Sequence, residues 1–108
     1  MEDQEMIRRL EKRDETILFY LREKYENYCR KIAGNFLPDR EDVEEILNDT
    51  WMNCWMSVPP AHPDSLKFYL ARITQNLSMK RLRYFYAEKR KIPETALLEE
   101  LEESIFSV

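Results

Sequence analysis

The sequence predicts an all-α domain: a bundle of three main helices, with a short N-terminal helix and a short acidic helix near the C-terminus. Three observations support this fold class. The 108 residues include one glycine and five prolines, too few backbone breakers for the many turns of a β-sandwich or barrel. Charged residues make up 35% of the chain and hydrophobic residues 44%, a mixture typical of amphipathic helices. Long stretches also repeat apolar residues at three- and four-residue spacing.

The first two helices are expected over residues 3–12 and 15–36. The first is short and polar, with Met6, Ile7 and Leu10 as a thin apolar strip. Asp14 is placed to cap the second, because its carboxylate can accept a hydrogen bond from an unpaired backbone N–H. The predicted buried face of the second helix consists of Ile17, Leu18, Leu21, Tyr25, Tyr28, Cys29, Ile32 and Phe36.

The third helix is expected over residues 40–57, because Pro38 breaks the chain before it. Asp39 is the predicted N-cap, and Asp42 stands three residues further on, as in a capping box. The predicted apolar face consists of Val43, Ile46, Leu47, Thr50, Trp51, Cys54 and, at its edge, Trp55.

A loop with three prolines, residues 58–64, precedes the fourth helix, expected over 65–90 with Asp64 or Ser65 as its cap. The predicted apolar side of this helix consists of Phe68, Ala71, Ile73, Leu77, Leu82 and Phe85. Residues 94–105 follow Pro93 as a short acidic helix, or as a tail that becomes ordered only against a partner. The expected domain therefore covers residues 1–91, and residues 92–108 form an acidic linker or helix.

The net charge of −4 hides a polarised distribution. Residues 39–56 carry six acids and one base, whereas residues 67–91 carry eight bases and one acid. Residues 92–108 carry five acids and no base. Because the local field decides what a surface attracts, the two central helices should suit different partners.

The fourth helix predicts contact with DNA, because bases and aromatics are interleaved along it. Lysine and arginine bind phosphates, aromatic rings stack on exposed bases, and asparagine can pair with a base edge. Arg72, Asn76, Lys80 and Arg83 are spaced so that they fall along one stripe. Two alternatives are an acidic protein partner and an ordinary solvated face.

The third helix predicts a protein contact, because its polar face is acidic and would repel DNA. Glu45, Asn48, Asp49 and Asn53 share that face, and Trp55 lies near its edge as a candidate anchor. An ordinary solvated face is again the alternative.

No catalytic residue, metal site or cofactor is expected. The chain has one histidine, His62, and one glycine, so it lacks a phosphate-binding glycine loop and a zinc motif. Cys29 and Cys54 both fall on predicted apolar faces and are expected to be buried thiols in a reducing cytosol. No apolar run is long enough to span a membrane, and the N-terminus does not resemble a signal peptide, so a cytoplasmic location is expected.

Three blocks of the sequence resemble region 2 of extracytoplasmic-function sigma factors, members of the sigma-70 family. They are LREKYENY at 21–28, DREDVEEILNDTWMNCW at 39–55 and LKFYLARITQNL at 66–77. The blocks occur in the family's order and with similar spacing, over residues 6–91. The resemblance implies a non-enzymatic transcription initiation domain that binds core RNA polymerase and the single-stranded −10 element of promoter DNA. An anti-sigma factor is a further candidate partner.

The resemblance also assigns roles to individual residues. The helix at 40–57 would dock on the clamp coiled coil of the largest polymerase subunit through Glu45, Asn48 and Asp49, with Asn53 and Trp55 nearby. The following helix would hold DNA, and residues 58–64 would form the base-capturing loop. The DNA-binding set is Lys67, Phe68, Tyr69, Arg72, Asn76, Lys80 and Arg83.

This chain departs from the family pattern at several positions. Asn48 and Asp49 replace a usual Gln-Glu pair, Tyr69 replaces a tryptophan, and Lys80 replaces an acid. The second helical domain of such factors is missing, so a truncated or isolated domain is expected. A different class of function stays open: a sigma-like interaction module that binds polymerase or an anti-sigma factor without promoter recognition. An enzyme is a third hypothesis, which would need turnover that depends on His62.

Overall fold

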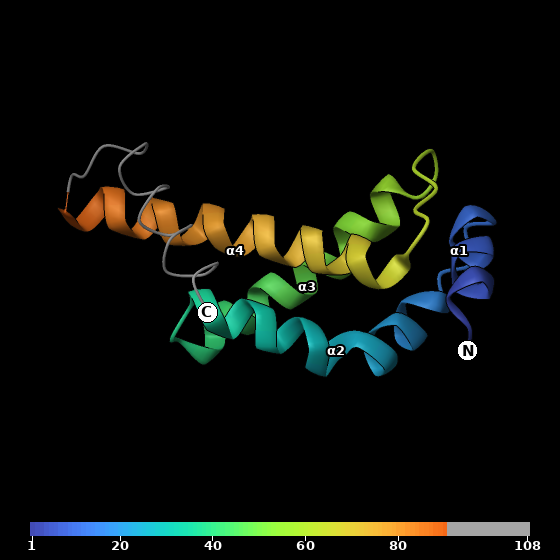
Figure 1. Cartoon of the computed structure of the whole chain (residues 1–108), viewed down its shortest axis with the longest axis horizontal. Coiled ribbons are helices and arrows are strands. Elements are labelled where there is room, and N and C mark those ends of the chain that lie inside the picture. The colour runs from blue at the N-terminus through green and yellow to red at the C-terminus, as the bar shows by residue number, and fades with distance from the viewer. Residues whose placement is uncertain (91–108) are drawn as a thin grey trace.

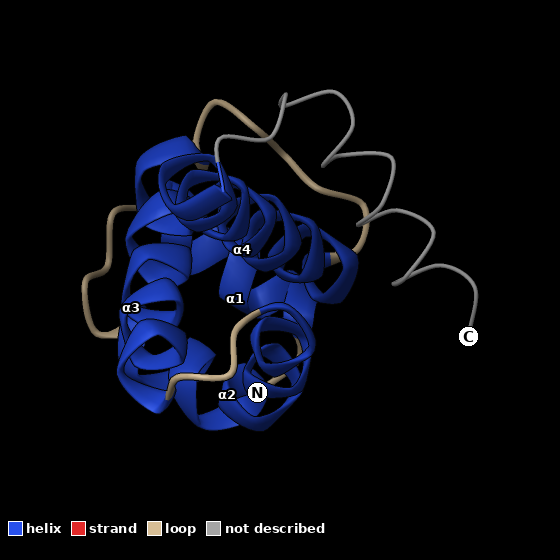
Figure 2. Ribbon diagram, turned by 90° about the vertical axis from the view of Figure 1, so that its left-hand side faces the viewer, coloured by secondary structure: helices blue, strands red, loops and turns tan. Residues whose placement is uncertain are grey.

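The computed structural model describes residues 1–90, which fold into four helices with no strand in that range. They are α1 (Asp3–Glu11), α2 (Ile17–Phe36), α3 (Arg40–Ser57) and α4 (Leu66–Arg90). The three long helices pack on one another, and α1 lies across the end of the bundle where α2 and α4 begin (Figures 1 and 2). The predicted all-α bundle is confirmed. The expected acidic helix at 94–105 lies outside the described residues.

One core connects all four helices, and its centre contains small polar side chains. Thr50 and Thr74 are fully buried, with their Oγ1 atoms 3.1 Å apart where α3 meets α4. Each hydroxyl also lies 2.8 Å from a carbonyl oxygen one turn earlier in its own helix. Cys29 and Cys54 are free and fully buried in the same core, as predicted. Small side chains here allow the helices to approach closely.

Two of the predicted helix caps are present. The Asp39 side chain accepts a hydrogen bond of 2.9 Å from the amide of Glu41 and so caps α3. The Ser65 hydroxyl accepts one of 3.3 Å from the amide of Phe68 at the start of α4, which decides between Asp64 and Ser65. Asp42 does not complete a capping box, because its carboxylate lies 2.9 Å from Arg81 of α4.

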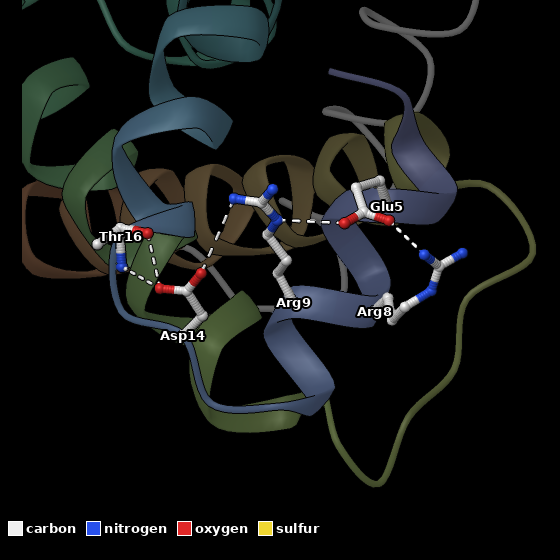
Figure 3. A network of polar contacts seen from close by, with 5 residues as sticks. All are labelled: Glu5, Arg8, Arg9, Asp14 and Thr16. Atoms are coloured by element: carbon white, nitrogen blue, oxygen red, sulfur yellow. Dashed lines mark hydrogen bonds and ion pairs between the residues drawn. The ribbon is translucent and has the colours of Figure 1, made fainter.

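The start of α2 differs from the prediction. The helix begins at Ile17, two residues later than expected. Asp14 still acts as a local cap, since its Oδ1 accepts hydrogen bonds from the amide and hydroxyl of Thr16 at 3.1 and 2.6 Å (Figure 3). These bonds fix a tight turn that leads into the helix, and they hold the pKa of Asp14 below its usual value.

The buried side of α4 also differs from the prediction. Phe68, expected in the core, is 70% exposed, and Ala71, Ile73, Leu77 and Phe85 are only half-buried. The side chains that face the core are spaced by four residues: Leu66, Leu70, Thr74, Ser78 and Leu82. Apolar residues occur on several sides of this helix, so hydrophobicity alone did not identify the side that packs.

Candidate functional site

A row of five exposed side chains runs along α4 on the side opposite the core. The row is spaced by four residues throughout, so its members lie on one line along the helix. We name it the α4 row: Phe68, Arg72, Asn76, Lys80 and Tyr84. It contains three members of the predicted stripe, Arg72, Asn76 and Lys80, and continues to Tyr84 rather than to Arg83, which is half-buried.

The α4 row is aromatic at both ends and cationic between them. Phe68 and Tyr84 are 70% and 62% exposed, and the Tyr84 ring lies edge-on to Phe85 with 6.4 Å between the ring centres. Arg72 and Lys80 form no ion pair with any residue that the structure describes. The central Asn76 is exposed between the two cations, with an amide that can donate and accept hydrogen bonds.

The two aromatic residues of the predicted DNA-binding set, Phe68 and Tyr69, lie in different environments. Phe68 points to solvent, whereas the Tyr69 hydroxyl lies 2.5 Å from Ser57 Oγ and its half-buried ring packs against the core. Tyr69 therefore connects the start of α4 to the end of α3. Lys67 is exposed, with its Nζ 4.9 Å from the centre of the Tyr28 ring.

Arg81 stands apart from the other bases of α4 because it faces α3. Its guanidinium lies 2.9 Å from Asp42 and 3.3 Å from Glu45. The hydrogen bond to Asp42 and the nearby Glu45 raise its pKa further above the usual value. Arg81 thus serves as a link between helices, a role that the sequence did not predict.

The exposed side of α3 has a mixed acidic and apolar character. Four of the predicted protein-binding residues lie on it: Glu45, Asn48, Asp49 and Asn53. Sequence analysis missed Met52 and Met56, which are 48% and 72% exposed on the same side. We name this surface the α3 face: Glu45, Asn48, Asp49, Met52, Asn53 and Met56.

Trp55, the predicted anchor, lies at the edge of α3 and is half-buried. The guanidinium of Arg13 covers one face of its ring, 3.7 Å from the ring centre. Only the part of the ring that stays exposed is available to a partner. Its role in docking remains a prediction.

The loop between α3 and α4 is attached to the bundle at several points. Val58 is fully buried, and the amide of Ala61 donates a 2.9 Å hydrogen bond to the carbonyl of Ser57. His62 Nδ1 lies 3.2 Å from Glu11 Oε2 on α1. Pro59 and Pro60 are exposed at the surface.

Chemical groups for catalysis are sparse in this arrangement. No cluster of three or more metal-ligating side chains occurs among the residues with described structure. His62 contacts a single carboxylate and has no nucleophile beside it within residues 1–88. None of the four helices is long and apolar enough to cross a membrane. What the structure does offer is one cationic, aromatic row and one acidic, methionine-bearing face.

Comparison with known families identifies the fold. Residues 21–84 match the family model described as Sigma-70 region 2, a span that covers most of α2, all of α3, the loop and α4 up to Tyr84. The chain belongs to the sigma-70 region 2 family. Searches of curated proteins and of solved structures gave no match. Domains of the sigma-70 region 2 family act in transcription initiation and, in general, bind RNA polymerase and promoter DNA.

The matched span contains both of the surfaces named above. The α3 face and the α4 row lie entirely within residues 21–84, and Tyr84 is the last residue of both the row and the match. In contrast, α1 and Arg13 precede the matched span. The extracytoplasmic-function subtype stays a prediction.

Proposed function

We propose that this domain, of the extracytoplasmic-function type, docks on the clamp coiled coil of RNA polymerase through the α3 face. It then holds the unpaired −10 strand of the promoter on the α4 row and the loop at 58–64. It contributes binding and positioning, and no catalysis. The observation that carries the proposal is the α4 row, where two exposed rings flank two cations and an amide.

The α4 row suits a single strand better than a duplex. Exposed rings stack on bases, and stacking contributes about 1–3 kcal/mol per base, but bases inside a duplex are not accessible. Phe68 and Tyr84 are separated by four helical steps of four residues, about 24 Å at the usual rise. A strand along this line would meet Arg72 and Lys80 with its phosphates and Asn76 with a base edge.

The α3 face suits a protein partner. Its acids would repel phosphates, and its exposed methionines can adapt to an apolar surface. The proposal assigns the docking contacts to Glu45, Asn48 and Asp49. The α3 face and the α4 row share no residue, so the proposal has polymerase and DNA bound at the same time.

Two pairs of matched variants test these assignments, with the full chain, purified core polymerase and a labelled single-stranded oligonucleotide selected from a random pool. Asp49→Arg should weaken polymerase binding, while Glu15→Arg, with the same charge change on an exposed residue outside the face, should not. Asn76→Ala should weaken oligonucleotide binding by the complex, while Asn27→Ala, also exposed, should not.

The outcome separates two functions. If Asn76→Ala leaves oligonucleotide binding unchanged while polymerase binding persists, the domain is an interaction module without promoter recognition. If Asp49→Arg binds polymerase as well as Glu15→Arg does, the docking assignment is wrong.

A further inference from the structure

The corner between α1 and α2 contains the one non-glycine residue of the described chain with a positive φ. Arg13 has φ 61° and lies just after α1. The amide of Arg13 donates to the carbonyl of Leu10, and the amide of Asp14 donates to that of Arg9, both at 3.0 Å. This pair of bonds closes a Schellman motif, in which the left-handed position is usually glycine. A left-handed backbone conformation destabilises an arginine relative to a glycine. We therefore expect the arginine side chain to make contacts that offset this strain.

The side chain of Arg13 makes three contacts at the junction of α3 and the loop. Its Nη1 donates hydrogen bonds of 2.8 and 2.9 Å to the carbonyl oxygens of Trp55 and Val58. Its guanidinium covers the Trp55 ring at 3.7 Å. Carbonyls at the end of a helix lack intrahelical partners and carry partial negative charge, so a cation satisfies them well. One side chain therefore ties the corner to the last turn of α3 and to the first loop residue.

A second contact from α1 reaches further along the same loop. Glu11 lies 3.2 Å from His62. Arg13 and Glu11 therefore hold the loop at two points, Val58 and His62. Pro59, Pro60 and Pro63 restrict the loop backbone, and a stiff loop held at two points has little freedom to shift.

The corner itself is fixed by its own polar network. Arg9 lies between Glu5 and Asp14, at 3.2 and 4.0 Å, and Asp14 binds Thr16 (Figure 3). The backbone around Arg13 is thereby held from both sides. The guanidinium therefore extends toward the loop from a backbone that is fixed by these contacts.

We propose that Arg13 is a positioning residue for the loop at 58–64, and that α1 acts as a brace that sets where this loop meets DNA. The inference rests on the proposed function, since it takes the loop to contact the unpaired strand. It assigns a role to Arg13 and α1, which precede the span matched by the family model.

The brace is tested first without DNA, by hydrogen exchange of single amides in the full chain. Arg13→Gly removes the side chain and relaxes the left-handed backbone, so any loss cannot come from added strain. The amides of Val58 and Ala61, which are hydrogen-bonded at the loop start, should exchange about tenfold faster or more. Arg22→Ala, on an exposed residue of α2 outside this network, is the control and should leave both unchanged. Unchanged exchange in Arg13→Gly overturns the inference.

The positioning role is then tested with core polymerase and the selected oligonucleotide. Arg13→Gly should weaken oligonucleotide binding by the complex about tenfold and polymerase binding much less, since Glu45, Asn48 and Asp49 are untouched, and Arg13→Lys should recover part of the loss. A merely structural role would lower both affinities together, which contradicts the inference. Equal oligonucleotide binding by Arg13→Gly and the wild type also overturns it. If the wild-type complex binds no oligonucleotide, the proposed function fails instead.

Discussion

The salt dependence of single-stranded DNA binding should report how many cations of α4 contact phosphates. Each neutralised phosphate releases condensed counterions, and for single strands the slope of log K against log salt changes by about 0.7 per contact. Three basic side chains of the predicted DNA-binding set are exposed on α4: Lys67, Arg72 and Lys80. Arg81 is excluded from the count, because Asp42 and Glu45 already hold it.

The expected magnitudes follow from this count. Three contacts predict a slope of about −2.1, so raising salt fourfold, from about 50 to about 200 mM, should weaken binding about 18-fold. Arg72→Ala or Lys80→Ala leaves two contacts and a slope of about −1.4, so the same change of salt should weaken binding only about sevenfold. Asn76→Ala should lower the affinity without changing the slope, because it removes no charge.

The measurement is a fluorescence anisotropy titration of the labelled oligonucleotide at several salt concentrations. Arg81→Ala is the matched control, since it removes one base from the same helix but no phosphate contact. Its slope should equal that of the wild type. If Arg81→Ala flattens the slope as much as Arg72→Ala does, the assignment of cations on α4 is wrong.

Three further predictions concern the core and the α1–α2 contact. Burial raises the pKa of Cys54 to about 12, so at pH 8 a thiol reagent should modify it only after unfolding, and fast reaction of the native chain would contradict this. For Asp3, partial burial raises the pKa but the hydrogen bonds from Lys24 and Tyr25 outweigh it, so the pKa lies below the ordinary 3.8. The stability this carboxylate contributes is present above that value and is lost as pH falls below it, so the difference in Tm between wild type and Asp3→Asn should shrink in acid; a constant difference would refute it. Thr50→Val should change the free energy of unfolding by about 1 kcal/mol or less, because Thr74 can still donate to its own carbonyl, and a loss of several kcal/mol in a urea titration would oppose this.

The positions of the helices were predictable from the sequence, because local signals determine them. Pro38 and Asp39 mark the start of α3, and the predicted bounds of that helix agree with the structure. The buried face of α3 was also predicted correctly, since Val43, Ile46, Leu47, Trp51 and Cys54 recur at helical spacing on one side, although the exposed Met52 and Met56 on the other side were missed. The acidic surface of the same helix follows directly from this, because the side that is not buried must be exposed.

The packed side of α4 could not be predicted in the same way. This helix carries apolar residues on several sides, and two of the residues that face the core are Thr74 and Ser78 rather than large apolar residues. Phe68 was therefore assigned to the core, although it is exposed. The Thr74 hydroxyl is accommodated because Thr50 of α3 lies 3.1 Å away, a partner that depends on the packing of another helix.

The contacts of Arg13 and Arg81 could not be predicted from the sequence either, for a related reason. Each guanidinium binds groups more than thirty residues away along the chain. Nothing local separates Arg81 from Lys80, which is exposed next to it. Arg13 gave no signal either, because a left-handed corner is usually marked by glycine or asparagine and this one has neither.

The buried and exposed rows of α4 depend on each other. Every member of the α4 row follows a core-facing residue by two positions, which is slightly more than half a turn of the helix, so Asn76 lies opposite Thr74 and Arg72 opposite Leu70. A rotation of α4 by one residue would bury part of the row and separate Thr74 from Thr50. Leucine at position 74 could not form this hydrogen-bonding contact, which places the two hydroxyls 3.1 Å apart in the observed orientation of α4. The buried row of α4, three leucines with Thr74 and Ser78, thus sets the direction in which this helix presents its cations and rings, and it connects the packing of the bundle to the surface proposed to hold DNA.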